Sequence, residues 1–246
     1  MSKHLEETAR DKMWRAIISF SRDLEEIPGR KKWVQRKIAL TLHAADVDTC
    51  EGEVEKLTDF EFPDEIEKQR IIIMAYLALA DSVTALKECE YYFRRYPFRN
   101  LPVTKHRHIV NVCEMYFSRF YEIRSRLKNV LNAANKVISD KKFDVGAFIK
   151  LFDRIFDSEI RQRHGVHHRE RFDDVDVSRI FLMETLATRQ AVKNLHVGEY
   201  RQIANSWISR VRTQGKKVDE FLEAVANALI ENCDFLKPEE GRTKRK

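Results

Sequence analysis

Glycine and proline are scarce in this sequence, with 7 and 5 residues respectively among 246. Because both residues interrupt regular structure, their scarcity leaves room for few turns and argues against a fold of many short strands. An abundance of Lys, Glu, Arg, Leu and Ala, together with the lack of an alternating apolar pattern, favours helices instead. The sequence therefore predicts an all-α fold, a multi-helix bundle that contains one long heptad-patterned helix.

Cysteines are few and form no recognisable pattern. The four are scattered along the chain, at Cys50, Cys89, Cys113 and Cys233. Without a CxxC pair or a short Cys/His spacing, they fit free thiols in a reducing cytoplasm better than a disulfide framework or a zinc knuckle. The longest apolar run, Ile71 to Ala80, is too short to span a bilayer, and the charged N-terminus lacks the apolar core of a signal peptide. We therefore expect a soluble, cytoplasmic protein without a membrane partner.

Common catalytic signatures are also missing, because the sequence has no Walker loop and no GxGxxG, HExxH or GxSxG motif. Their absence argues against the usual nucleotide-binding, metalloprotease and hydrolase classes. The formal net charge of +6 is a moderate excess that favours an anionic partner. Positive charge is concentrated in residues 161–171 and in the tail 237–246, which has five basic residues against two acidic ones.

An apolar stripe between Thr104 and Ser139 is the strongest structural signal. Its members recur at alternating steps of four and three residues over four heptads: Ile109, Cys113, Tyr116, Phe120, Ile123, Leu127, Val130, Ala134 and Val137. A helix over this segment would be roughly 54 Å long at 1.5 Å per residue. Because such a stripe must be buried against other helices, we expect antiparallel packing within a bundle, which self-association would extend.

Apolar periodicity predicts further helices, which cover residues 2–27, 31–45, 63–96, 143–160 and 197–233, and one that Asp173 and Asp174 cap. Breaks are expected at Asp81–Ser82 and at Gly215.

The segment YPFRNLP, residues 96–102, contains two prolines and is the clearest linker. It separates an N-terminal helical region, residues 1–96, from a C-terminal helical domain, residues 103–236, which a basic tail follows at residues 237–246. For the N-terminal region, a regulatory or partner-binding role and simple membership of the same bundle both stay open.

The most informative part of the chain is Arg161 to Arg171, which reads RQRHGVHHRER. It gathers four arginines and three histidines around Gly165, namely Arg161, Arg163, Arg169, Arg171, His164, His167 and His168. We call these residues, 161–171, the Arg/His segment. Guanidinium groups hold phosphates through charged hydrogen bonds, and imidazole exchanges protons near neutral pH. The combination predicts chemistry on a phosphodiester.

An arginine followed by a histidine after four to six intervening residues, between helices of an all-α bundle, resembles the signature of the HEPN superfamily. Two registers fit. Arg163 pairs with His168 in one, with the polar His164 after the arginine. Arg161 pairs with His167 in the other, where Gln162 replaces the asparagine or aspartate usual in that family. The resemblance covers about residues 103–233 and implies a HEPN-like helical domain.

The resemblance implies a metal-independent endoribonuclease of a toxin or antiviral defence system. Such an enzyme needs no cofactor, and it dimerises so that two motifs face one cleft. A histidine would take the proton from a ribose 2′-hydroxyl, which attacks the neighbouring phosphorus, while an arginine stabilises the growing charge. The products would be a 2′,3′-cyclic phosphate and a 5′-hydroxyl.

Candidate site residues follow from the resemblance and from local charge. The catalytic candidates are Arg161, Arg163, His164, His167 and His168. The RNA-binding candidates are Arg169 and Arg171, together with Lys105 and Arg107 at the start of the heptad-patterned helix.

Other interpretations of the Arg/His segment stay open. Basic residues at a helix end also satisfy exposed carbonyls and the negative end of the helix dipole, which is a purely structural role. The histidine spacing also suits metal ligands on one helical face, although the positive neighbours oppose a cation, and we expect no metal. The alternative to the nuclease is a non-catalytic helical adaptor or accessory subunit that binds RNA or an acidic protein partner.

Overall fold

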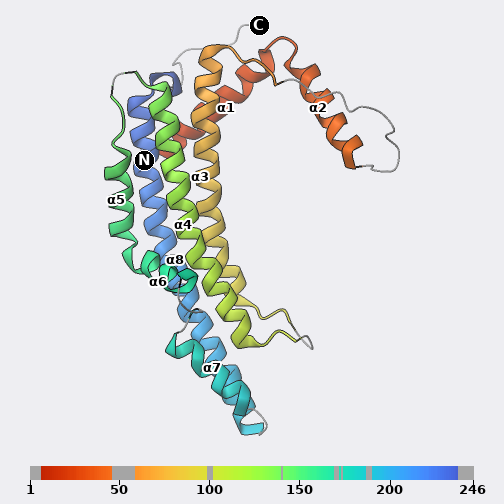
Figure 1. Cartoon of the computed structure of the whole chain (residues 1–246), viewed down its shortest axis with the longest axis vertical. Coiled ribbons are helices and arrows are strands. Elements are labelled where there is room, and N and C mark those ends of the chain that lie inside the picture. Colours follow the sequence, from red (N-terminus) through yellow and green to blue (C-terminus); the bar gives the residue numbers. More distant parts are fainter. Residues whose placement is uncertain are drawn as a thin grey trace, which may run out of the picture. The chain divides into compact units, whose positions relative to one another are not determined.

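The computed structural model describes residues 7–45, 59–98, 102–139, 141–168, 172, 174–186 and 190–237, and all side chains in these ranges except those of 42–45, 163–168 and 190–195. The regular structure in these ranges is entirely helical (Figure 1). The helices are α1 (Ala9–Glu26), α2 (Arg30–Ala45), α3 (Asp64–Arg94), α4 (Lys105–Val137), α5 (Val145–Ile155), α6 (Asp157–His168), α7 (Val175–Leu186), α8 (Gln190–Asn232) and the short 3-10 helix η1 (Asp234–Leu236). The predicted all-α multi-helix bundle is confirmed.

The chain divides into two compact units. The first comprises residues 1–73 and 226–246, and the second comprises residues 74–225. Both α3 and α8 contribute residues to each unit. The described residues of the YPFRNLP segment lie inside the second unit, so this division of the chain falls elsewhere than at the predicted linker. A separate function for residues 1–96 stays a prediction, and the basic tail beyond Lys237 lies outside the described residues.

The first unit begins with a well-defined helix start. The Thr8 hydroxyl accepts a hydrogen bond from the Asp11 backbone amide, and the Asp11 carboxylate accepts one from the Thr8 amide. This reciprocal pair satisfies backbone donors that a helix N-terminus leaves unpaired. α1 ends before Pro28 and Gly29, as predicted, and Gly29 adopts the left-handed φ of 80° that glycine tolerates.

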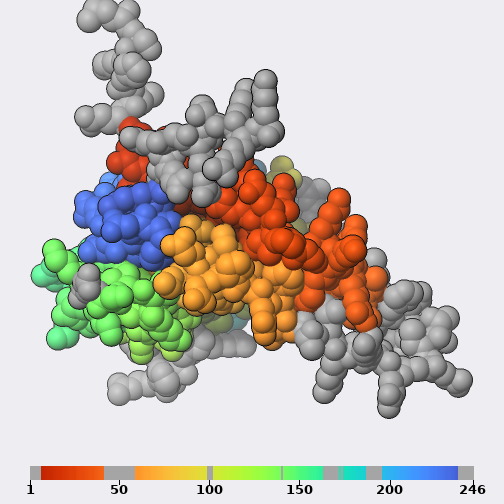
Figure 2. Space-filling model, turned by 90° about the horizontal axis from the view of Figure 1, so that it is seen from above, coloured from red at the N-terminus to blue at the C-terminus, as the bar shows by residue number. Residues whose placement is uncertain are grey.

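After this turn, α2 runs away from α1 (Figures 1 and 2). None of its side chains from residue 30 to 41 is buried. The side chain of Ile38, which the apolar spacing of a helix over residues 31–45 would turn inward, is instead 55% exposed. The spacing of apolar residues in α2 therefore does not produce a buried face within the described chain.

The second unit is built around α4. Eight of the nine predicted stripe residues are buried, and Val137, at the helix end, is half-buried. α4 packs against α5, α6 and α7. Its aromatic side chains also meet α8, since the Tyr116 ring lies 5.8 Å from the Trp207 ring. The heptad pattern thus correctly identifies the central helix of this unit.

Two predicted helix breaks are wrong. α3 continues through Asp81 and Ser82, where the buried Ser82 hydroxyl donates a hydrogen bond of 2.7 Å to the Leu79 carbonyl. Since the helix itself satisfies this hydroxyl, no interruption is needed. α8 continues through Gly215, where a Cβ atom would lie 3.1 Å from the side chain of Lys87 on α3. The glycine thus allows close approach of the two helices rather than a kink.

A different break, at Phe156, was not predicted. It ends α5 and allows α6 to begin at Asp157. Phe156 is fully buried, with its ring 4.7 Å from Phe152 and 5.4 Å from Phe120. The predicted cap of the next helix is confirmed at Asp174, whose carboxylate accepts hydrogen bonds from two backbone amides of α7. Asp173 lies outside the described residues.

Truncating the central stripe should lower stability strongly. Leu127→Ala removes a fully buried side chain from α4, and we expect a loss of about 2–5 kcal/mol in the free energy of unfolding, measured with urea. Lys128→Ala, at the neighbouring exposed position, should change it by less than about 0.5 kcal/mol. Equal effects of the two substitutions would contradict the burial of the stripe.

Candidate functional site

The start of the Arg/His segment is helical. α6 continues through Gly165 to His168, where the sequence predicted a turn between helices. Among the catalytic candidates, Arg161 has a described side chain, while Arg163, His164, His167 and His168 have a described helical backbone. The RNA-binding candidates Arg169 and Arg171 lie outside the described residues. The candidate site is therefore located by the backbone of α6 and by the side chains around it.

Arg161 lies at the surface. Its Nε donates a hydrogen bond of 2.8 Å to Oδ1 of Asp157, one turn earlier on α6, and its side chain is 79% exposed. An exposed pair within one helix contributes little to stability. The guanidinium is therefore open to water rather than held beneath another helix.

Helical geometry separates the members of each predicted register. A residue advances by about 100° around an α-helix, so Arg163 and His168 are about 140° apart, and Arg161 and His167 about 120°. Positions four apart, such as 163 and 167, are only about 40° apart. The backbone of α6 therefore places Arg163 on the same side as His167.

A buried ion pair anchors the first turn of α6. Glu159 is only 1% exposed, and its Oε1 accepts a hydrogen bond of 3.0 Å from Nε of Arg210 on α8. The Tyr116 hydroxyl, on α4, donates to the same oxygen at 3.3 Å. Burial and the nearby Glu159 charge raise the pKa of Tyr116 well above its usual range, so this hydroxyl stays a donor. Three helices therefore meet at one carboxylate.

Arg210 extends this anchor toward the Arg/His segment. Its guanidinium donates a second hydrogen bond of 3.1 Å to Oε1 of Gln162 and lies 4.9 Å from the centre of the Trp207 ring. Neither Glu159 nor Arg210 is predicted from the sequence. A signal was present, because Glu159 continues the helical spacing of the buried Phe152 and Phe156. A charged residue at a position that should be buried indicates a buried partner.

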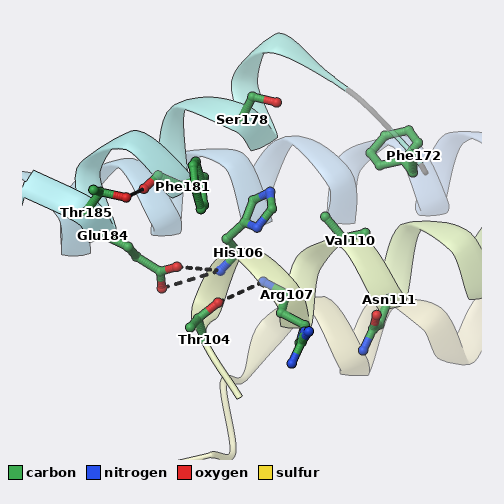
Figure 3. Close-up of a pocket in the computed structure, with 10 residues that line it drawn as sticks. All are labelled: Thr104, His106, Arg107, Val110, Asn111, Phe172, Ser178, Phe181, Glu184 and Thr185. Carbon is green, nitrogen blue, oxygen red and sulfur yellow. Dashed lines mark hydrogen bonds between the residues drawn. The ribbon is translucent and has the colours of Figure 1, made fainter. Parts of the chain in front are cut away.

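A pocket of about 660 Å³ lies between the start of α4 and α7 (Figure 3). Val110, Phe172 and Phe181 supply its apolar wall, and His106 points from α4 toward α7. Phe172 comes directly after the Arg/His segment in the chain. The pocket therefore lies beside the end of the predicted site, although the sequence did not predict it.

The two basic candidates on α4 point to different places. Arg107 lines the pocket, is exposed, and has no ion pair among the described residues. The Lys105 ammonium instead lies 5.5 Å from the centre of the Tyr200 ring on α8. The structure thus brings Arg107 to the pocket and directs Lys105 toward α8.

Glu184 joins α7 to the start of α4. Its carboxylate accepts hydrogen bonds from the backbone amides of Lys105, at 2.7 Å, and His106, at 3.4 Å. The Thr104 hydroxyl accepts another from the amide of Arg107 at 3.1 Å. These acceptors satisfy unpaired donors at the positive end of the α4 dipole. The contact holds the two walls of the pocket together.

Behind this contact lies the buried His196 of α8. Its Nε2 is 3.7 Å from Oε1 of Glu184, too far for a hydrogen bond, and has no other hydrogen-bond partner among the described residues. Burial and the positive Lys105 lower the pKa of His196 below 6.5, while Glu184 has the opposite, smaller effect. The folded protein therefore favours the neutral imidazole.

Comparisons with protein-family models, with curated proteins and with solved structures find no match for this chain. Within the described ranges, no helix has the length and apolar character that crossing a lipid bilayer requires. The described side chains also include no group of three His, Cys, Asp or Glu residues arranged to hold a metal ion. The three histidine side chains of the Arg/His segment lie outside that description.

Removing the partner of Glu159 should be costly. Arg210→Met leaves a buried carboxylate without its cation, and we expect the free energy of unfolding in urea to fall by about 3–5 kcal/mol. The matched control is Arg124→Met, which breaks the partly exposed Arg124–Asp153 pair and should cost about 1 kcal/mol or less. Restoration of part of the loss by Glu159→Gln in the Arg210→Met background would support the pairing. Similar losses in the two single variants would refute it.

The lowered pKa of His196 predicts a pH dependence. The unfolded chain binds a proton on this histidine near pH 6.5, while the folded protein resists it, so stability falls as the pH drops through that value. We expect the free energy of unfolding of the wild type, relative to that of His196→Phe, to decrease between pH 7.5 and pH 5. Contributions of the other histidines cancel in this difference. A difference that is constant with pH would contradict the burial of a neutral His196.

Proposed function

We propose that the protein is a HEPN-like, metal-independent endoribonuclease, an effector of a toxin or antiviral defence system, with its catalytic groups on the Arg/His segment. The observation that carries the proposal is the concentration of four arginines and three histidines in the eleven residues 161–171. This exceeds what the end of one helix needs for its carbonyls and dipole. It supplies both the charge that binds a phosphodiester and a base that accepts a proton.

The anchoring of α6 supports this proposal. Catalytic side chains must be held in a defined geometry, and rigid helices hold them better than loops do. Glu159 and Arg210 fix the first turn of α6, and Gln162 receives a further hydrogen bond at the edge of the Arg/His segment. The exposed Arg161 on the same helix leaves its positive charge accessible to a nucleic acid.

In the proposed reaction, a neutral imidazole takes the proton from a ribose 2′-hydroxyl. The 2′-oxygen then bonds to phosphorus, the bond from phosphorus to the 5′-oxygen breaks, and the departing oxygen receives a proton. A guanidinium stabilises the charge on the phosphoryl oxygens. DNA lacks the attacking hydroxyl and is not cleaved. Within one chain, the helical backbone of α6 places Arg163 and His168 about 140° apart, and Arg161 and His167 about 120° apart. In a homodimer, Arg163 of one copy and His168 of the other complete one cleft.

A second candidate function is that of a non-catalytic adaptor, which binds RNA or an acidic protein partner. The observation that favours it is the separation of about 140° between Arg163 and His168 around α6, since groups that act on one phosphate must converge. Binding by such an adaptor weakens steeply with salt but is followed by no turnover.

RNA cleavage in excess EDTA separates the two functions. We expect the purified chain to cut labelled RNA but not matched DNA, and to leave 2′,3′-cyclic phosphate ends. Arg163→Ala should slow cleavage by about 100-fold or more. Replacing the histidine that acts as the base, by His167→Ala or His168→Ala, should do the same, since general base catalysis contributes factors of this size. Arg161→Ala tests the second register.

Arg126→Ala is the matched control, because it removes an exposed arginine of α4 outside the Arg/His segment and should leave the rate unchanged. Equal rates in all four variants would rule out the proposed catalytic groups. Salt-sensitive gel shifts without loss of RNA would favour the adaptor.

A further inference from the structure

The pocket between α4 and α7 offers polar groups that the described protein leaves unused. Asn111 is exposed on α4, and its carboxamide has no hydrogen-bond partner among the described residues. The His106 imidazole likewise has no hydrogen-bond partner there, although its ring lies 5.4 Å from that of Phe181. A carboxamide both donates and accepts, and so does a neutral imidazole. A ligand of this pocket would therefore present donors and acceptors of its own.

The walls of the pocket are suited to a flat ring. Phe172 is 9% exposed, and its ring is held 5.7 Å from Trp207 and 5.5 Å from Phe117. Phe181, on α7, is 54% exposed, so its ring is accessible from the pocket. Bases of single-stranded RNA stack on exposed aromatic rings of this kind.

The positive charge of Arg107 at the rim of the pocket indicates that a ligand with a flat ring would also carry an anionic group. Arg107 and Asn111 are one helical turn apart and lie side by side on α4 (Figure 3). The Arg107 guanidinium has no ion pair among the described residues and is therefore free to hold an anion. A nucleotide combines a planar heterocycle with a phosphate, which matches an exposed aromatic ring beside an unpaired guanidinium. The cavity volume of about 660 Å³ is in the range typical of small-molecule sites.

We propose that this pocket binds a nucleobase of single-stranded RNA, with Arg107 on the adjoining phosphate, and thereby sets the base preference of cleavage. The base preference rests on the proposed nuclease function, whereas RNA binding does not. The base stacks on Phe181 and His106 bonds to its edge, while Asn111, beside Arg107 on α4, bonds to the adjoining sugar and phosphate. Phe172 follows His168 by four residues, so their Cα atoms are at most roughly 14 Å apart. A single strand of RNA that leaves the pocket therefore has the Arg/His segment within reach.

Calorimetric titration of the full chain tests the site. The probes are the four 5′-ribonucleoside monophosphates, ribose 5-phosphate, and four homohexanucleotides of 2′-O-methyl RNA, which lack the attacking hydroxyl. We expect at least one nucleotide and the matching hexanucleotide to bind, and ribose 5-phosphate to bind much more weakly. Asn111→Ala and Phe181→Ala should each weaken binding of both ligands about tenfold or more.

Matched controls lie on the same two helices. Asn129→Ala removes an exposed asparagine roughly 27 Å further along α4, and Leu182→Ala removes an exposed side chain of α7 that does not line the pocket. Both should bind within twofold of the wild type.

Four results would overturn the site. These are no binding of any nucleotide or hexanucleotide, equal binding by Asn111→Ala and Asn129→Ala, ribose 5-phosphate binding as tightly as a nucleotide, and a hexanucleotide affinity that is insensitive to Asn111. The last would identify a site for free nucleotides.

The cleavage assay separates this inference from the nuclease proposal. Where RNA is cut, cleavage by His106→Ala at saturating RNA should lose its base preference, whereas Arg163→Ala should lose cleavage and retain hexanucleotide binding. Retained base preference in His106→Ala would refute the specificity role. Binding that depends on Asn111 without any cleavage would support the pocket as an RNA site and overturn the nuclease.

Discussion

The buried ion pair between Glu159 and Arg210 is the constraint on which the arrangement of the second unit depends. A carboxylate that is 1% exposed is tolerable only with a cation and hydrogen-bond donors beside it. Arg210 supplies the cation from α8 and Tyr116 supplies a hydroxyl from α4. Because all three groups must meet, the first turn of α6 cannot shift without leaving a charge unpaired. The direction in which α6 carries its basic residues is therefore set inside the bundle rather than at the surface.

Pairing with a carboxylate also distinguishes the arginines that hold helices in place from those that remain available to bind a ligand. Most of the arginines with described contacts lie beside carboxylates, as Arg124 does beside Asp153 and Arg119 beside Glu122. Arg107 makes no ion pair with a carboxylate among the described residues, and it lies at the rim of the pocket. Glu184 is nearby, but its carboxylate is engaged by the backbone amides of α4. The Arg107 guanidinium therefore has no carboxylate paired with it among the described residues.

The helices could be predicted where each one carries its own pattern. The α4 stripe repeats with helical period, so its burial follows from local sequence. The break at Phe156 could not be predicted, since Phe152, Phe156 and Glu159 continue the helical spacing without glycine or proline. Phe156 packs at that break against Phe120 and Phe221, which are far from it in the sequence. The candidate site divides in the same way. The Arg/His segment is visible in the sequence, but the pocket depends on Glu184 meeting a helix start 78 and 79 residues away.

The boundary between the two compact units falls inside α3 and inside α8 rather than in a loop. A fragment containing either unit alone would have to cut both helices in mid-course. Each cut would leave about four backbone amides on one side and about four carbonyls on the other without their partners. Cutting a chain at its domain boundaries succeeds where a linker joins the domains. Here the cut would expose helix ends without capping groups. Each unit is therefore compact, but the two continuous helices α3 and α8 belong to both units.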